Sequence, residues 1–138
     1  MNVLTCATCA SPLTGPLRLL PEVPPRPVYE GYKNPDGSRH PPATVPRGAY
    51  AVDPEPSGEG CLMSAGPRGT LVTHPEDSRA HLTDNPALDE IGCCGPPGRE
   101  GPNSLCAECG SVVATLYADC TGAYETDFLP DAVRITAV

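Results

Sequence analysis

The chain has 138 residues, a formal net charge of −8 and only nine basic residues. Nucleic-acid binding relies on clustered lysine and arginine, so this composition argues against a nucleic-acid partner. The chain has no Trp and one Phe, whereas Pro (19) and Gly (14) are abundant, which excludes long helices and predicts a thin hydrophobic core.

The first residues carry neither a basic segment nor a long apolar one, and no apolar run in the chain approaches the roughly 18 residues of a membrane helix. We therefore expect no signal peptide, no contact with a membrane and a cytoplasmic location. Cysteines stay reduced in that compartment. The eight cysteines of the chain thus favour metal binding over disulfide bonds.

The chain opens on a predicted zinc knuckle. Residues 3–5 have the composition of a short strand that enters the motif Cys6-x-x-Cys9, and a turn at 14–16 leads to a second strand at 17–20. Strand, knuckle and strand in this order form the half-unit of a zinc ribbon.

A proline-rich connection follows at residues 21–47. Its composition predicts an extended or mobile segment without regular structure, onto which Asn34-Pro35-Asp36-Gly37 imposes a turn. Two interpretations remain open: a polyproline ligand for a partner, or an irregular insertion, which we favour. Tyr29 and Tyr32 are the side chains expected to dock the connection onto the body of the protein.

The middle of the chain holds two similar segments, 46–55 and 67–76, each of which indicates a turn, a strand and a terminating proline. We expect these two strands to pair with each other. Residues 85–91 predict one helical turn, with Asn as the cap and Pro at the first position. His74 and His81 are candidate metal ligands, although a solvated loop position is the interpretation that we favour for both.

The last third holds a glycine-rich loop at 92–103, which is expected to bring two adjacent cysteines next to a second knuckle, Cys106-x-x-Cys109. Residues 112–119 form the clearest predicted strand of the chain, with alternating faces, and residues 132–138 alternate as a strand that closes the sheet.

The two Cys-x-x-Cys pairs predict one structural zinc site built from Cys6, Cys9, Cys106 and Cys109. Zinc favours four tetrahedral ligands, and thiolates are among its best. Closing the long loop between the two pairs costs about 4 kcal/mol of conformational entropy. A zinc site of four cysteines contributes about 10–16 kcal/mol, so the free energy of metal binding exceeds the cost of closing the loop. Buried free thiols and redox dithiols are the alternatives.

The other four cysteines leave three interpretations open. In the first interpretation, Cys93, Cys94 and Cys120 form a second zinc site, together with Cys61 or a histidine. In the second, Cys94 and Cys120 complete a local site with the second knuckle, and the first knuckle stands apart. In the third, all four are apolar buried thiols.

Several motifs resemble those of a family of small, cysteine-rich, zinc-ribbon-like actinobacterial proteins that brings no activity with it. They are Leu4-Thr5-Cys6-x-x-Cys9, Gly92-Cys93-Cys94-Gly95, Gly101-Pro102-Asn103, Cys106-x-x-Cys109-Gly110-x-Val112 and Asp119-Cys120. Two distant Cys-x-x-Cys pairs in an all-β chain also resemble the β-tent group, which includes Yippee-like and zinc-bearing methionine sulfoxide reductase domains. That likeness implies two knuckles meeting at one zinc, and the reductases imply a further catalytic cysteine, for which Cys61 or Cys120 is available.

We therefore predict an all-β, loop-rich, zinc-stapled single domain of zinc-ribbon or β-tent type over residues 1–138. Its parts are the first knuckle and hairpin at 1–20, the connection at 21–47, middle strands and loops at 48–91, and the second knuckle and C-terminal strands at 92–138. The expected function is a binding or adaptor module that recognises a protein partner, with Zn²⁺ in a structural role and no assigned catalytic residue. The alternative is a thiol-based enzyme of the methionine sulfoxide reductase-like class.

Overall fold

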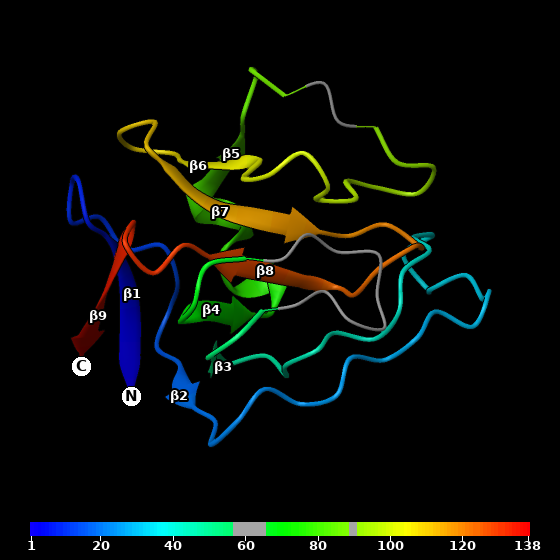
Figure 1. Ribbon diagram of the computed structural model, residues 1–138, viewed down its shortest axis with the longest axis horizontal. Helices are drawn as coiled ribbons and strands as arrows, with labels where there is room; N and C mark the ends of the chain where they lie inside the picture. The colour runs from blue at the N-terminus through cyan, green and yellow to red at the C-terminus, as the bar shows by residue number, and fades with distance from the viewer. Residues whose placement is uncertain (57–65, 89–90) are drawn as a thin grey trace.

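The computed structural model describes residues 1–56, 66–88 and 91–138. Within these residues the chain is all-β, as predicted, and its only helical segments are two short 3-10 helices, η1 (Pro75–Asp77) and η2 (Arg79–His81). The strands, shown in Figure 1, are β1 (Asn2–Cys6), β2 (Arg18–Leu19), β3 (Ala49–Asp53), β4 (Thr70–Thr73), β5 (Leu82–Asp84), β6 (Ser104–Cys106), β7 (Val112–Tyr117), β8 (Glu125–Phe128) and β9 (Val133–Ala137). No helix among the described residues has the length and apolarity that crossing a membrane requires.

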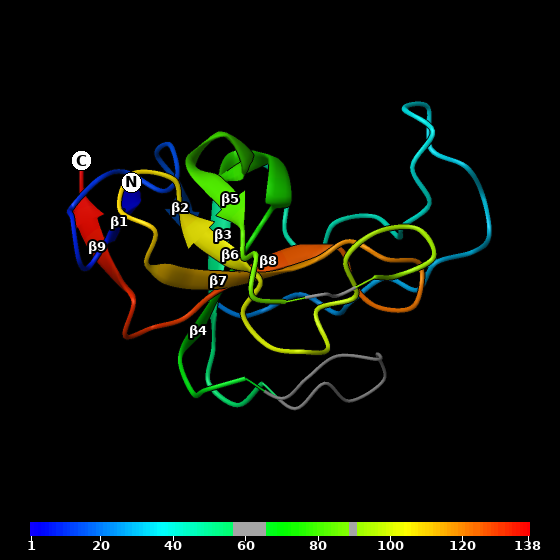
Figure 2. The same cartoon turned by 90° about the horizontal axis from the view of Figure 1, so that it is seen from above.

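The two ends of the chain pair with each other. β1 runs antiparallel to β9, with Asn2 opposite Ala137 and Cys6 opposite Val133, so the termini lie side by side (Figure 1). The predicted last strand is therefore present, but it does not close the main sheet. It forms a separate two-stranded ribbon with β1, which Figure 2 shows at one end of the molecule.

The main sheet has seven strands in the order β2-β3-β4-β8-β7-β6-β5. The predicted pairing of the two proline-ended segments is confirmed, because β3 and β4 are antiparallel neighbours. β5, β6 and β8 are strands that the sequence did not indicate. At the position of the predicted helical turn, Asn85 instead directs a tight turn: its side-chain oxygen accepts from the Ala87 N–H at 3.0 Å and its carbonyl from the Leu88 N–H at 3.2 Å.

β7 departs from strict alternation at Val113. Ser104 of β6 lies opposite Ala114 and Leu105 opposite Val112, which leaves Val113 as an extra residue on β7. Val113 and Ala114 consequently both join the same hydrophobic cluster, although alternation predicts opposite faces for them.

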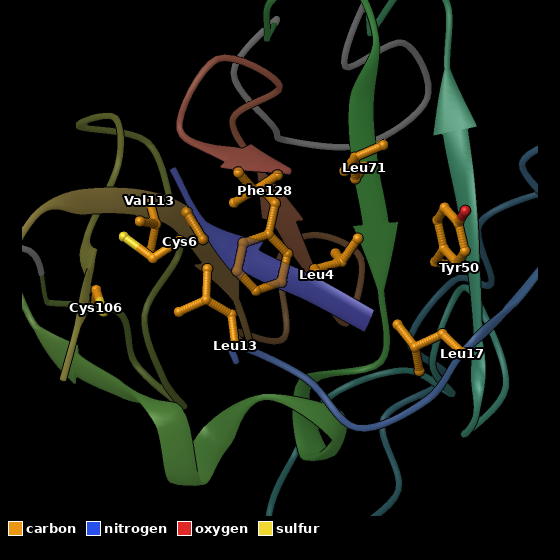
Figure 3. Close-up of a cluster of buried hydrophobic side chains, with 11 residues drawn as sticks. Leu4, Cys6, Leu13, Leu17, Tyr50, Leu71, Cys106, Val113 and Phe128 are labelled. Carbon is orange, nitrogen blue, oxygen red and sulfur yellow. The ribbon is translucent and has the colours of Figure 1, made fainter. Parts of the chain in front are cut away.

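The larger core cluster lies between the ribbon and the main sheet. Its buried members are Leu4, Cys6, Leu13, Leu17, Tyr50, Leu71, Cys106, Val113, Ala114, Phe128 and Val133. In Figure 3, Phe128 occupies the centre of this cluster, and Cys6 and Cys106 lie toward the end marked by Val113. The two cysteine side chains thus belong to the core as well as to the knuckles.

The proline-rich connection covers the opposite face of the main sheet. A smaller cluster there contains Val45, Ala51 and Val72, against which Leu20 and Val23 pack. No strand forms between β2 and β3 in this described stretch, which agrees with the interpretation as an irregular insertion.

The two connection tyrosines contact each other. The Tyr29 hydroxyl donates to the Tyr32 carbonyl at 2.5 Å, and their rings lie 5.6 Å apart. Arg26 and His40 join the connection to the body of the protein; the His40 ring stacks on that of Tyr124 at a centroid distance of 3.6 Å.

Arg26 enters a buried carboxylate cluster on this face. Its guanidinium donates to both oxygens of Glu125, at 2.7 and 3.1 Å, and lies 3.4 Å from Asp53; the Thr44 hydroxyl also donates to Glu125, at 2.8 Å. Burial opposes ionisation of Glu125, but hydrogen bonds to Asp127 and Arg26 outweigh it and lower the pKa of Glu125. Burial and the adjacent Glu125 charge raise the pKa of Asp127 well above its usual value. Burial and the Glu125 charge thus favour the neutral form of Asp127, whereas Arg26 favours the ionised form of Glu125.

Candidate metal centre

The first knuckle is a tight turn that follows directly from β1. The Cys6 N–H donates to the Ser11 carbonyl at 2.9 Å, and the Ala10 N–H donates to the Cys6 carbonyl at 2.8 Å. Ala10 has φ of 64° and is the only described non-glycine residue with a positive φ. Its backbone thus adopts the left-handed conformation that closes the turn and aims both sulfurs in one direction.

The second knuckle repeats this arrangement between β6 and β7. The Cys106 N–H donates to the Ser111 carbonyl at 2.8 Å, and the Gly110 N–H donates to the Cys106 carbonyl at 2.8 Å. Gly110 has φ of 76°, a conformation that glycine adopts at little cost. The two knuckles share the pattern Cys-Ala-x-Cys-Ala/Gly-Ser, so the same local hydrogen bonds shape both.

Other parts of the chain fix the knuckles in place through the alanine that follows each first cysteine. The Ala7 N–H donates to the Ala132 carbonyl at 2.9 Å, just before β9, and the Ala107 N–H donates to the His81 carbonyl at 3.0 Å, at the end of η2. The backbone of His81 therefore supports the second knuckle. Its imidazole joins neither group of candidate ligands among the described residues, and neither does that of His74.

The two knuckles bring their four sulfurs to one point, as predicted. The Sγ atoms of Cys6 and Cys109 lie 3.7 Å apart, and those of Cys9 and Cys106 lie 3.8 Å apart; all four lie within 4.8 Å of one another. A tetrahedron with zinc–sulfur bonds of about 2.3 Å has edges of about 3.8 Å. The distances and the donor set of four thiols therefore fit a tetrahedral thiophilic ion.

Burial divides the four cysteines into an inner and an outer pair. Cys6 and Cys106 are buried, whereas Cys9 and Cys109 are exposed. Burial raises the pKa of the Cys106 thiol to about 11. The side chain and backbone of Ser111 donate hydrogen bonds that lower the pKa of Cys109 to about 6, and Ser11 lowers the pKa of Cys9 in the same way. Each knuckle thus supplies one thiol whose anionic form is stabilised by the protein.

A second group lies at the other end of β7, where Cys120 follows the strand. Cys93 Sγ lies 3.1 Å from Cys120 Sγ and 3.5 Å from Cys94 Sγ. Asp119 joins the three cysteines, with Oδ1 at 3.6 Å from Cys93 Sγ, and the four ligand atoms lie within 4.8 Å of one another. The sequence did not identify Asp119 as a candidate ligand, although its position next to Cys120 was the one available signal.

This grouping shows where Cys93, Cys94 and Cys120 lie. The interpretation in which Cys94 and Cys120 complete a local site with Cys106 and Cys109 is wrong, because the second knuckle faces the first and the other two cysteines face Cys93. The interpretation as buried apolar thiols also fails for Cys93 and Cys94, which are exposed. Cys61 lies outside the described residues.

The chain matches no protein-family model, no curated protein and no solved structure. The family resemblances of its motifs therefore stay predictions, and the geometry of the two cysteine groups is the evidence that bears on function.

Proposed function

We propose that Cys6, Cys9, Cys106 and Cys109 hold one structural Zn²⁺ ion, and that the protein is a zinc-stapled module that recognises a protein partner. The observation that supports this proposal is the convergence of four sulfurs from two matched knuckles. Four protein ligands complete the coordination of zinc and leave no position for a substrate or a reactive water. A closed site of this kind stabilises a fold.

The location of the site explains what the ion would stabilise. The knuckles lie where the β1–β9 ribbon meets the main sheet, and Cys6 and Cys106 belong to the cluster that packs between these two layers. The chain has a single Phe and no Trp, so few large aromatic side chains are available to stabilise this interface. A structural zinc site contributes about 10–16 kcal/mol, which exceeds the total stability of most domains of this size.

The structural role is tested by replacing zinc with Co²⁺, whose visible spectrum reports its ligands. We expect the spectrum of a tetrahedral four-thiolate site that does not change when azide or cyanide is added, and cooperative loss of tertiary structure when the metal is chelated. A spectrum that shifts with added anions would show an open coordination position and would contradict the structural assignment.

The exposed edge of β9 is the surface that best suits recognition of a partner. β1 pairs along one edge of β9, and no described strand pairs along the other. Ile135 in β9 is 49% exposed. A free edge accepts an extended segment by adding a strand to the sheet, and the net charge of −8 favours a segment that carries lysine or arginine.

Recognition at this edge is tested with a partner captured by the intact chain. The β9 amides should gain protection from hydrogen exchange in the complex. Ile135→Pro should abolish capture, because the register of β1 and β9 turns the Ile135 N–H away from β1 and proline cannot donate to an added strand. Val52→Thr, an exposed change on β3, is the control and should bind normally. Protection elsewhere in the chain, with β9 unaffected, would assign recognition to another surface.

A thiol-dependent reductase is the second candidate function, favoured by the 3.1 Å separation of the Cys93 and Cys120 sulfurs. In such a reaction two thiols would give two electrons and two protons to a sulfoxide, leaving a disulfide, a thioether and water. Hydrogen bonds with Cys93 and Cys94 raise the pKa of Cys120 to about 12, which opposes thiolate formation. Thiol titration of the zinc-loaded protein separates the two functions: a hyper-reactive cysteine supports the enzyme, and uniformly slow thiols support the module.

A further inference from the structure

The second cysteine group depends on a loop that only glycine permits. At Gly92 an added Cβ atom would overlap the Gly95 carbonyl oxygen and approach Asp119 Oδ2 to 2.7 Å, and at Gly95 it would overlap the Ala118 carbonyl oxygen. The Ala118 N–H also donates to the Pro96 carbonyl at 2.9 Å. The loop therefore lies in direct contact with the residues that follow β7.

Asp119 completes this contact and orients the cysteines. Its Oδ1 accepts from the Cys94 N–H at 2.9 Å, and its Oδ2 accepts from the Thr121 hydroxyl at 3.1 Å. A carboxylate held from both sides points in a fixed direction, in the manner of the hydrogen-bonded carboxylates that serve as metal ligands. The result is a cluster of three thiols and one carboxylate whose positions are set by backbone contacts.

We propose that Cys93, Cys94, Cys120 and Asp119 form a second metal site, for a thiophilic divalent cation of the Zn²⁺ type. The Cys93 Sγ to Asp119 Oδ1 distance of 3.6 Å is close to the sulfur–oxygen edge of about 3.5 Å in a tetrahedral zinc site. The sulfur pairs at 3.1 and 3.5 Å separate by several tenths of an ångström toward the edge of about 3.8 Å. Rotation of exposed side chains permits this movement.

The number and type of ligands favour a metal over a redox pair. A disulfide needs two sulfurs, whereas three sulfurs and a carboxylate converge here, which is a complete tetrahedral set. Each thiol that becomes a ligand gives its proton to the solvent, so that two positive charges of the ion meet four negative charges of the ligands. The oxygen ligand from the carboxylate also favours an ion of intermediate softness, such as Zn²⁺, over a soft ion that prefers sulfur ligands alone.

The two sites differ in accessibility. The first has two buried sulfurs within the core, whereas Cys93 and Cys94 are exposed. β7 separates the sites, because the second knuckle precedes this strand and Cys120 follows it (Figure 1); its six residues span roughly 20 Å. We therefore expect the second ion to exchange rapidly while the first stays bound.

The experiment loads the full chain with ¹¹³Cd²⁺, a probe for zinc sites, under reducing conditions and records ¹¹³Cd NMR with the metal content. The wild-type chain should take up two equivalents and show two resonances, with the four-thiolate site further downfield. A chelator should remove the other resonance first. Cys120→Ser should lose that resonance and one equivalent, while its thermal unfolding midpoint stays close to that of the wild type.

Cys61→Ser is the matched control, because Cys61 is not a member of the proposed ligand set; it should keep both resonances. Uptake of metal by the wild-type chain without the resonance that Cys120→Ser is expected to lose would overturn the proposal. So would retention of both equivalents by Cys120→Ser, or loss of the second resonance in Cys61→Ser. A Cys93–Cys120 disulfide that persists under reducing conditions would overturn it in favour of redox chemistry. All of these results concern the second equivalent, so they are independent of the fate of the first site.

Discussion

Ala10 and Gly110 occupy equivalent positions in the two knuckles, each with a positive φ, 64° and 76°, and each donating its N–H to the carbonyl of the first cysteine of its knuckle at 2.8 Å. Two knuckles about a hundred residues apart in the chain thus form the same turn, with alanine at the left-handed position in one and glycine in the other. The backbone of Ala10 is strained by its Cβ atom, whereas that of Gly110 is not.

Ala10→Gly should therefore stabilise the metal-loaded protein by about 0.5–1 kcal/mol, and Gly110→Ala should destabilise it by about 1 kcal/mol. No atom lies within 4 Å of a Cβ added at Gly110, so the second effect is purely conformational. Denaturant unfolding measures both free energies. Ala107→Gly, at an exposed knuckle position with ordinary φ, is the control and should lower stability slightly. A stabilising Gly110→Ala change would contradict the left-handed conformation of the second knuckle.

Ser111 should set the acidity at which the first centre loses its metal. The Ser111 hydroxyl and N–H lower the pKa of Cys109 to about 6, so protons compete less with the metal for this thiolate. Ser111→Ala removes one donor and moves the pKa of Cys109 back toward its usual value. The pH at which half the metal is released should then rise, and metal affinity at neutral pH should fall about 10–100-fold.

Competition with a colorimetric zinc chelator across a pH series measures this shift. Thr8→Ala changes an exposed knuckle residue of similar size and should leave the release curve in place. Equal release curves for Ser111→Ala and the wild type would show that the hydroxyl does not support the thiolate.

Asp127 and Glu125 should respond with opposite signs to the same isosteric change. The raised pKa of Asp127 means that the folded state keeps a proton that the unfolded state releases, so stability falls as pH rises above the usual aspartate pKa. Asp127→Asn removes this loss and should stabilise the protein increasingly from about pH 4 upward. The lowered pKa of Glu125 contributes stability that is present at neutral pH and lost as pH falls.

Glu125→Gln should consequently destabilise the protein at neutral pH, where it leaves the Arg26 charge without its main partner, and should have less effect in acid. Thermal unfolding midpoints from about pH 2 to about pH 8 measure both profiles, because the contribution of Glu125 is lost only below the usual glutamate pKa. Parallel profiles for Asp127→Asn and the wild type would contradict the raised pKa of Asp127.

Arg26 should anchor the proline-rich connection to the sheet. Its side chain is 22% exposed and reaches the fully buried Glu125. Arg26→Met should therefore cost about 2 kcal/mol, less than the roughly 3–5 kcal/mol of a fully buried ion pair, because some solvent screens the charge. Arg39→Met changes an exposed arginine of the same connection and should cost less than about 0.5 kcal/mol. Limited proteolysis should cut the connection faster in Arg26→Met only. Equal cleavage of the two variants would show that the anchor lies elsewhere.

The sequence identified the parts of this fold whose pattern is local. Cys-x-x-Cys motifs, proline-ended strands and an alternating segment such as Val112–Tyr117 each carry their evidence within a few residues. β8 was missed because Glu125 and Asp127 make it look like a loop. Their burial depends on Arg26, 99 residues from Glu125 along the chain, and no local pattern reveals such a partner.

The candidate sites divide in the same way. The first group was predictable because repetition of the motif supplies all four ligands. The second was only partly predictable, because its membership depends on how closely the loop at Gly92 and Gly95 approaches the end of β7. That approach placed Cys94 beside Asp119 rather than beside the second knuckle. Spacing along the chain could not distinguish these arrangements.

Anomalous diffraction at the zinc edge tests the central claim most directly, because it locates the metal relative to the sulfurs. The account predicts a peak at about 2.3 Å from each of the four sulfurs of Cys6, Cys9, Cys106 and Cys109. A crystal of the folded protein with no peak between the two knuckles would contradict it. So would a peak in contact with the sulfurs of one knuckle alone.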